Sequence, residues 1–232
     1  PTRRDRVILH IYDLSAADEK DPKNRAEREY QVIQRWQKSP CLPNLLDSFQ
    51  EAEHYPGELY YFSLVDPAAP SLIERSQDSN WNLDDRLHFA RNALLALAGF
   101  HHPPEDGLQP LVHRHITPHT LRVRHDGRPL FTDFSLARLS DAPTISAATP
   151  DFGDDALYVA PEVRSGGLTA ADARSDVFAL CKTLIELFTD DTPKAAEVAP
   201  TGGLLSSTVN PEGGVPKLPT QEVDFTRLAA EQ

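Results

Sequence analysis

The chain has 232 residues, 40% of them hydrophobic, so it suits one large domain or two small ones with a sizeable core. Its 23 basic and 35 acidic side chains give a formal net charge of −12, which disfavours general attraction to nucleic acid or to an anionic membrane surface. The sequence has no run of about 18 apolar residues and no apolar signal region near its start. We therefore expect a cytoplasmic protein without a membrane span, whose partners are proteins or small ligands.

The first part of the chain predicts a small mixed sheet with one helix. Apolar and β-branched residues indicate strands over 6–14, 44–50 and 58–65. After the first of these, apolar residues recur at three- and four-residue steps from Ala26 to Trp36, which is typical of an amphipathic helix.

Two longer helices are predicted in the second part. The first begins after Asn82, a residue suited to capping a helix, and the second covers 172–189. Their apolar stripes, which we expect to face the core, are Leu83, Leu87, Ala90, Leu94 and Leu97 on the first helix and Val177, Cys181, Leu184 and Phe188 on the second. Between the helices the sequence predicts a hairpin around Asp126-Gly127 and an irregular stretch over 133–162.

The cysteines and the end of the chain carry further expectations. Cys41 and Cys181 lie far apart, which favours buried thiols in a reducing compartment. The segment 191–220 is rich in proline and glycine and predicts a linker or tail, while 221–232 has the pattern of a short helix. The chain has no methionine, from which we expect that the sequence is an incomplete record of a longer protein.

Several short motifs follow one another in the second part. They are VHRHITPHTLRV at 112–123, TDFSLARL at 132–139, YVAPE at 158–162 and SDVFALCKTLIELF at 175–188. In order and spacing they resemble the carboxy-terminal lobe of the eukaryotic-type protein kinase fold, and the whole resemblance extends from about Arg6 to Asp190.

The resemblance implies an α+β, two-lobed fold. Residues 1–66 would be a truncated, β-rich N-lobe that starts at the family's third strand and holds one αC-type helix. Residues 67–190 would be a mainly helical C-lobe with the catalytic-type loop and the activation segment, and 191–232 a tail or an incomplete end of that lobe.

Residues that hold the family's fold together are kept. His113 and Arg114 match the first two letters of the catalytic-loop HRD motif, and Asp133 and Phe134 match the metal-binding aspartate and the phenylalanine of DFG. By the same resemblance, Asp176 anchors the backbone of the catalytic-type loop.

Most positions that perform phosphoryl transfer in the family are changed. Glu29 matches the helix glutamate, but its partner lysine, which contacts the ATP phosphates, is replaced by His10, and we ask whether these two side chains pair. The catalytic aspartate is replaced by His115, the lysine two residues on by Thr117, and the asparagine that holds the second magnesium ion by Thr120.

These changes predict a pseudokinase, which is a regulatory or scaffolding module of a larger signalling or defence protein, similar to bacterial serine/threonine kinases. Asp133 and two threonines form a poor magnesium site, because Mg²⁺ requires several oxygen ligands in octahedral geometry. We therefore expect no cofactor and, as partners, other proteins or adjacent domains of the same chain. Two alternatives do use ATP: an active, atypical serine/threonine kinase with Asp133 on magnesium and His115 as base, and a non-catalytic nucleotide-binding switch.

Three local features have more than one interpretation. Six histidines between positions 101 and 125 raise a zinc site as a rival to packing and loop roles, although no cysteine or carboxylate completes a recognisable spacing. Arg114 either packs the loop or, as in the family, receives a phosphorylated side chain. The candidates for that modification are Ser140, Thr144, Ser146 and Thr149. A literal Asp-Phe-Gly at 151–153 is interpreted as a loop turn rather than a metal site.

Overall fold

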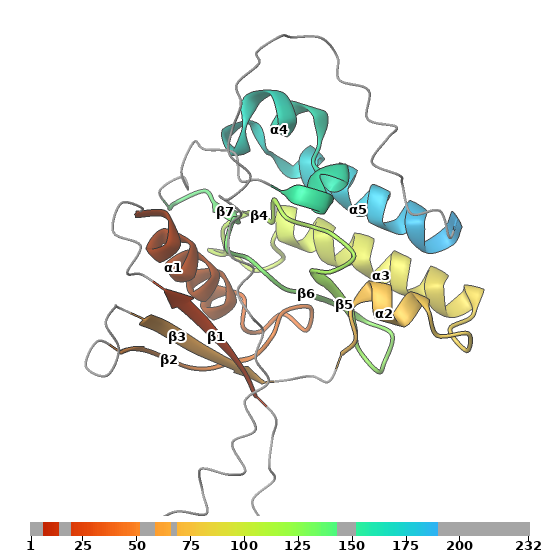
Figure 1. Ribbon diagram of the computed structural model, residues 1–232, viewed down its shortest axis with the longest axis horizontal. Helices are drawn as coiled ribbons and strands as arrows, with labels where there is room; N and C mark the ends of the chain where they lie inside the picture. The colour runs from red at the N-terminus through yellow and green to blue at the C-terminus, as the bar shows by residue number, and fades with distance from the viewer. Residues whose placement is uncertain (1–6, 14–19, 52–58, 66–68, 143–151, 190–232) are drawn as a thin grey trace, which may run out of the picture.

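The structure, a computed structural model, describes residues 7–13, 20–51, 59–65, 69–142 and 152–189. Its first part is a three-stranded sheet with one helix (Figure 1). The elements are β1 (Val7–Asp13), α1 (Lys20–Arg35), β2 (Leu45–Glu51) and β3 (Leu59–Val65), and the strand order is β1-β3-β2. Both strand pairs are antiparallel, so the prediction of a mixed sheet was wrong.

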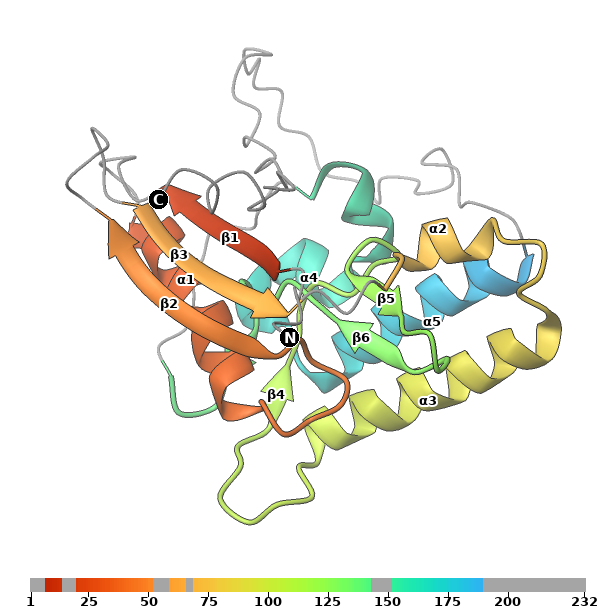
Figure 2. The ribbon, with the colours of Figure 1, turned by 90° about the horizontal axis from the view of Figure 1, so that it is seen from below.

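The second part is mainly helical and carries two short antiparallel ribbons, β4 with β7 and β5 with β6. Its elements are α2 (Leu72–Ser76), α3 (Leu83–His101), β4 (Leu111–Val112), β5 (Leu121–Val123), β6 (Pro129–Phe131), β7 (Arg138–Leu139), the 3₁₀ helix η1 (Gly153–Tyr158), α4 (Pro161–Gly166), the 3₁₀ helix η2 (Leu168–Ala170) and α5 (Ala173–Thr189). The helices α3 and α5 lie side by side (Figure 2). This combination of helices with small sheets fits the α+β class.

The long elements of the chain agree with the sequence patterns. The predicted strands, the helices α1, α3 and α5, and the hairpin at Gly127, whose φ is 75°, are confirmed. The predicted irregular stretch over 133–162 was wrong in part, because it contains β7, η1 and the start of α4. The predicted tail and the predicted helix over 221–232 lie outside the described residues.

One hydrophobic core joins α1 to the second part of the chain. Trp36, directly after α1, meets Phe100 of α3 edge to face with ring centroids 5.3 Å apart, and Phe100 meets Phe131 of β6 in the same way at 5.1 Å. Edge-to-face contacts of buried rings add to the free energy gained from burial alone. These contacts fix β6, and with it the segment that leads directly to Asp133.

The predicted apolar stripes of α3 and α5 are only partly buried. Ala90, Leu97 and Leu184 face the core, whereas Leu83, Leu87, Leu94, Val177 and Phe188 are 61%, 51%, 45%, 44% and 40% exposed. The expectation that the whole stripes face the core was therefore wrong. Each helix also carries apolar residues on a second face, and that face, with Phe89 and Phe100 on α3 and Leu180 on α5, is the one that is buried.

Neither cysteine matches the expectation of a buried thiol. Cys181 lies on the outward side of α5 and is exposed, and Cys41 is half-buried. The described part of the chain contains no helix with the length and apolar character of a membrane span.

Candidate functional site

The catalytic-type loop, residues 113–120, is held in place by α5. The backbone N–H groups of His113 and Arg114 donate to the two carboxylate oxygens of Asp176 at 2.7 and 2.8 Å, and the Nε2 atom of His101 lies 3.0 Å from the same carboxylate. Asp176 is 1% exposed, so water does not compete for these bonds. The prediction that Asp176 anchors the loop is confirmed.

His113 is a packing residue of this loop. Its ring is fully buried, and its centroid lies 4.6 Å from that of Phe134. Burial lowers the pKa of His113 to about 4, so the ring is neutral near pH 7. Its Nδ1 atom accepts the backbone N–H of His115 at 3.3 Å.

The two threonines that replace family residues brace the loop. The Thr120 hydroxyl donates to the His115 carbonyl at 2.8 Å and accepts the Thr117 N–H at 2.9 Å. The Thr117 hydroxyl in turn accepts the N–H groups of His119 and Thr120 at 3.2 and 3.3 Å. Both side chains are buried, at 1% exposure for Thr117 and 8% for Thr120. Their hydroxyl groups therefore serve the loop backbone instead of a metal ion or a phosphate.

His115 lies between two carboxylates that come from different segments. Its Nδ1 atom is 2.9 Å from Asp133 Oδ2, and its Nε2 atom is 3.4 Å from Asp155 Oδ2. Asp155 belongs to η1, and Phe152, directly before η1, places its ring 5.9 Å from the imidazole. The other oxygen of Asp133 accepts the Ser135 hydroxyl at 2.7 Å.

These contacts set the charge of the site. Burial by itself lowers the pKa of His115, but the hydrogen bonds with Asp133 and Asp155 and their negative charges outweigh burial and raise it to about 10. For Asp133, burial raises the pKa, but the hydrogen bonds and charge of His115, with the Ser135 hydroxyl, bring it below its usual range. A protonated imidazole has no lone pair to accept a proton, so the geometry does not support His115 as a general base at neutral pH.

Arg114 has an unusual environment for a charged side chain. It is 8% exposed, its φ is 68°, and none of its guanidinium nitrogens has a hydrogen-bond partner among the residues that the structure describes. Burial lowers its pKa to about 10, and the charges of Arg138 and Arg28 act in the same direction. This cluster of cations is suited to an anion. Ser140, one candidate for phosphorylation, donates to Gln109 at 2.9 Å, and the other three candidates lie outside the described residues.

The structure brings together His10 and Glu29, the two residues that the resemblance aligns with the family's lysine–glutamate pair. His10 Nδ1 lies 3.8 Å from Glu29 Oε2, and Glu29, on α1, is 2% exposed. The pairing that the sequence raised as a question is present. It preserves the link between β1 and α1, although an imidazole is shorter than a lysine side chain.

The arrangement does not fit the magnesium ion that the resemblance implies. Both oxygens of Asp133 are engaged by His115 and Ser135, and the Thr120 hydroxyl is turned to the backbone. Among the residues that the structure describes, no group of three His, Cys, Asp or Glu side chains is arranged to hold a metal ion. The histidines that raised zinc as a rival do not converge either, since His101 faces Asp176 while His113 is buried against Phe134.

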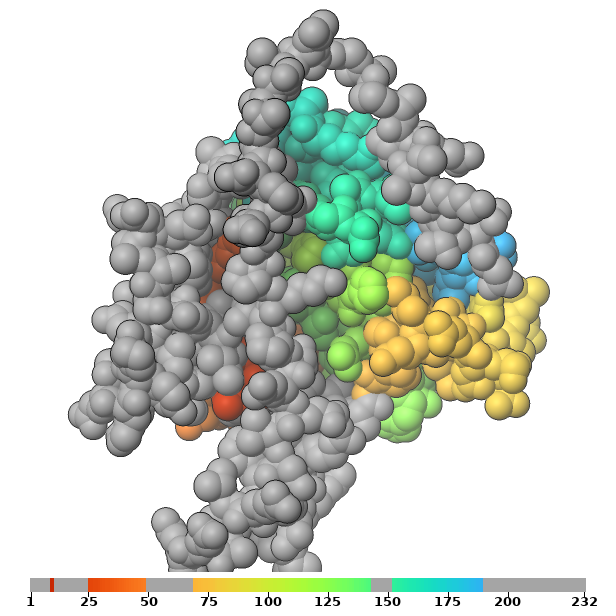
Figure 3. Space-filling view, in the orientation of Figure 1, coloured from red at the N-terminus to blue at the C-terminus, as the bar shows by residue number. Residues whose placement is uncertain are grey.

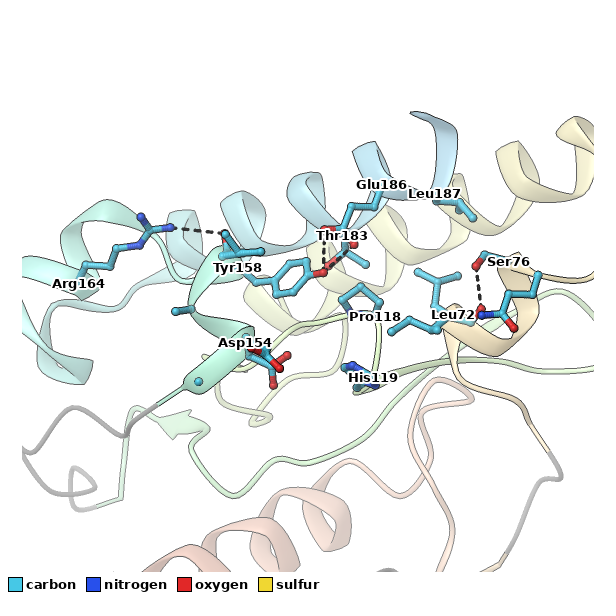
Figure 4. Close-up of a pocket in the computed structure, with 16 residues that line it drawn as sticks. Leu72, Ser76, Pro118, His119, Asp154, Tyr158, Arg164, Thr183, Glu186 and Leu187 are labelled. Carbon is cyan, nitrogen blue, oxygen red and sulfur yellow. Dashed lines mark hydrogen bonds between the residues drawn. The ribbon is translucent and has the colours of Figure 1, made fainter. Parts of the chain in front are cut away.

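A cavity of about 880 Å³ lies beside the loop, between α2, η1 and α5. On the surface shown in Figure 3, α2 lies next to α3 and below the segment that contains η1 and α4. Inside the cavity, the Tyr158 hydroxyl donates to the Glu186 carboxylate at 2.6 and 2.8 Å (Figure 4). Burial, followed by the Glu186 contact, raises the pKa of Tyr158, and burial raises that of Glu186.

Sequence reasoning missed this cavity and the role of Asp155. The helix α2 has five residues, too few for a periodic pattern, and η1 falls in the stretch that was expected to be irregular. In the sequence, the Asp-Phe-Gly at 151–153 was the feature that could have drawn attention to η1 and Asp155. Its interpretation as a turn agrees with the φ of 50° at Gly153, while Asp151 lies outside the described residues.

Comparison with known proteins finds similarity to protein kinases, in agreement with the motifs. No family model matches the chain. The serine/threonine-protein kinase PrkC of Bacillus subtilis is 37% identical over 194 residues, which is 83% of this chain and 28% of PrkC. PknL of Mycobacterium tuberculosis, also a serine/threonine-protein kinase, is 37% identical over 90 residues, which is 38% of this chain and 22% of PknL.

A plant relative extends the comparison. The LRR receptor-like serine/threonine-protein kinase RGI1 of Arabidopsis thaliana is 29% identical over 135 residues, 58% of this chain and 11% of that protein. The chain thus matches less than a third of the length of each of these relatives. Its similarity to several serine/threonine protein kinases supports a protein-kinase-like family for this chain.

Proposed function

We propose that this chain is a protein-kinase-like domain that transfers no phosphoryl group and acts as a regulatory or scaffolding module for other proteins. The observation that carries the proposal is the position of His115 between Asp133 and Asp155. Phosphoryl transfer depends on positioning ATP and on neutralising the charge that spreads over the phosphate oxygens. Here His115 of the catalytic-type loop contacts Asp133 and Asp155 instead.

The parts that remain are structural. Asp176 still holds the loop, and His10 with Glu29 still joins the sheet to α1. Thr117 and Thr120 replace two polar family residues and now brace the loop backbone. A domain that keeps its framework while its reactive positions become internal contacts fits a binding role better than an enzymatic one.

The cavity between α2, η1 and α5 supports protein binding. Leu72 and Leu187 contribute apolar walls, Asp154 and Glu186 contribute carboxylates, and the Thr183 hydroxyl is buried with no hydrogen-bond partner in the structure (Figure 4). Apolar walls beside carboxylates suit the aliphatic stem and charged head of an arginine or lysine side chain. We therefore propose a basic protein segment as the partner.

A thermal-shift titration with ATP, in Mg²⁺ and in EDTA, tests the loss of activity. The proposal predicts no magnesium-dependent shift. A shift that persists in EDTA would support the nucleotide-binding switch. A shift that requires Mg²⁺ and disappears in Asp133→Asn would contradict the proposal and support the atypical kinase.

Binding of a library of arginine-containing peptides tests the partner class. We expect Glu186→Gln to weaken the binding of selected peptides at least several-fold. The matched control is Glu105→Gln, because Glu105 is exposed and does not line the cavity. Equal binding by the two variants would contradict a role for the cavity.

A further inference from the structure

The contacts of His115 favour a ring that is protonated on both nitrogens. Each ring nitrogen lies near a different carboxylate oxygen, at 2.9 Å for Asp133 and 3.4 Å for Asp155. A neutral imidazole carries one N–H, so it can donate to only one of them. The ring satisfies both carboxylates only when both nitrogens are protonated, and it then carries a positive charge.

This positive charge lies beside the aspartate that the resemblance assigns to the family's metal site. Asp133 is the one aspartate of the family's metal site that the chain keeps, and its two oxygens accept from His115 and Ser135. The backbone of Asp133 has a φ of 62°, in the left-handed region, which fixes the direction in which the carboxylate leaves the chain. Each oxygen of the carboxylate therefore has one hydrogen-bond partner within the chain, and Oδ2 faces His115.

The same ring connects two segments that are distant in sequence. Asp155 of η1 faces one ring edge, and the Phe152 ring packs on the imidazole with centroids 5.9 Å apart and planes inclined by 48°. The His115 side chain is 18% exposed, so little of it faces solvent. The segment 152–155 thus encloses His115 on the side opposite Asp133.

We infer that His115 takes the place of the divalent metal ion in this chain: as an internal cation it neutralises Asp133 and fastens η1 to the catalytic-type loop through Asp155. This inference deepens the proposed loss of phosphoryl transfer and gives it a structural cause. Asp155 is then a positioning residue of the activation segment, a role that the sequence did not indicate. A cation between the carboxylates of Asp133 and Asp155 reduces their mutual repulsion, and protonated His115 is that cation.

Mn²⁺ binding, measured by the loss of its free-ion EPR signal, tests the first half of the inference. The variants are His115→Asp, the double variant His115→Asp with Asp133→Asn, and His119→Asn as a control in the same loop. We expect no saturable site in the wild type or in His119→Asn, one site in His115→Asp, and its loss in the double variant. Circular dichroism confirms that each variant is folded.

Two results would overturn this half. One is a saturable Mn²⁺ site in the wild type that Asp133→Asn removes. The other is a folded His115→Asp variant that gains no site. A wild-type protein that binds Mn²⁺ but transfers no phosphate would refute the inference and leave the proposed function standing, so the two failures are distinguishable.

Hydrogen exchange of the amides of residues 152–158 tests the second half. We expect His115→Asn and Asp155→Asn each to speed exchange in this segment at least tenfold, with no change in α3. The control His119→Asn leaves the segment unchanged. Unchanged exchange of 152–158 in both test variants would show that His115 does not fasten η1.

Discussion

Buried titratable side chains gather in and around the catalytic-type loop, and each has its own electrostatic surroundings. His113 is neutral because it is surrounded by aromatic rings, while His115 is charged because it faces two carboxylates. The two histidines are two residues apart in sequence, yet their pKa values shift in opposite directions, to about 4 and to about 10. Local environment, not residue type, therefore determines what each ring does.

The low pKa of His113 predicts a loss of stability in mild acid. The unfolded chain takes up a proton on this ring near pH 6.5, whereas the folded chain does so only near pH 4. The stability linked to His113 is therefore complete above pH 6.5 and is lost as the pH falls towards 4, by about 1.4 kcal/mol per pH unit. Urea unfolding at pH 6.5 and pH 5 measures this slope.

The control variant for this prediction is His113→Phe, which keeps a buried ring that cannot take up a proton. Its free energy of unfolding should fall by about 2 kcal/mol less than that of the wild type over the same interval. His125→Phe, at an exposed turn position, should behave like the wild type. Identical slopes for the wild type and His113→Phe would rule out His113 as the source.

The Arg114 guanidinium has no hydrogen-bond partner among the described residues, so we expect that removing its charge stabilises the fold. A buried charge without a hydrogen-bond partner costs free energy, so we expect Arg114→Met to raise the free energy of unfolding by about 1–3 kcal/mol. Sulfate should stabilise the wild type more than the variant, because the cluster with Arg28 and Arg138 attracts an anion. Destabilisation by Arg114→Met in sulfate-free buffer would mean that the side chain is paired in solution.

At the scale of elements, α5 is the framework on which the loop is built. Asp176 in its first turn accepts two backbone N–H groups of the loop, while Asp172, directly before the helix, bonds to Arg174 near the surface. The two aspartates are close in sequence but differ in burial and in what they hold. They provide a matched pair for mutation.

We expect Asp176→Ala to lower the free energy of unfolding by at least about 3 kcal/mol, because two buried N–H groups lose a charged acceptor. Asp172→Ala should cost about 1 kcal/mol, the usual value for losing a residue that caps a helix start. Urea unfolding of both variants makes the comparison. Equal costs would show that the loop does not depend on its anchor.

Some of these elements could be predicted from the sequence and others could not. The helices α1, α3 and α5 follow from apolar periodicity, because each is long enough for the pattern to repeat. Which face of α3 is buried could not be predicted, since Leu87 and Leu97 have the same character and only packing distinguishes them. The motifs correctly indicated that Asp133, His115 and Asp176 lie in or against the catalytic-type loop, with Asp176 holding it from α5.

The contact of His115 with Asp155 could not be predicted in the same way. It depends on the position of η1 and on the positive φ of Asp133, which are set by the folded backbone. No spacing rule connects a loop histidine with an aspartate in a distant 3₁₀ helix.

At the scale of the whole molecule, the helices α3 and α5 both present exposed apolar side chains. Leu87 is 51% exposed and Ile185 is 53% exposed, on two helices that lie side by side (Figure 2). Exposed apolar residues that gather on neighbouring elements mark surfaces that contact other groups.

This exposure predicts that polar substitutions are tolerated there. We expect Leu87→Lys with Ile185→Lys to change the free energy of unfolding by less than about 0.5 kcal/mol and to reduce the fluorescence of a bound hydrophobic dye. Leu97→Lys, at a position with 2% exposure, should prevent folding. A loss of several kcal/mol in the double variant would show that the surface is covered in solution.

We expect no phosphoryl transfer from this kinase-like domain, because its reactive positions are internal contacts centred on His115. The decisive measurement is transfer of label from γ-labelled ATP to the chain itself or to an added protein, in Mg²⁺ and in Mn²⁺, with Asp133→Asn as the control. With either ion, the wild type should incorporate no more label than Asp133→Asn. Incorporation by the wild type that Asp133→Asn abolishes would contradict this expectation.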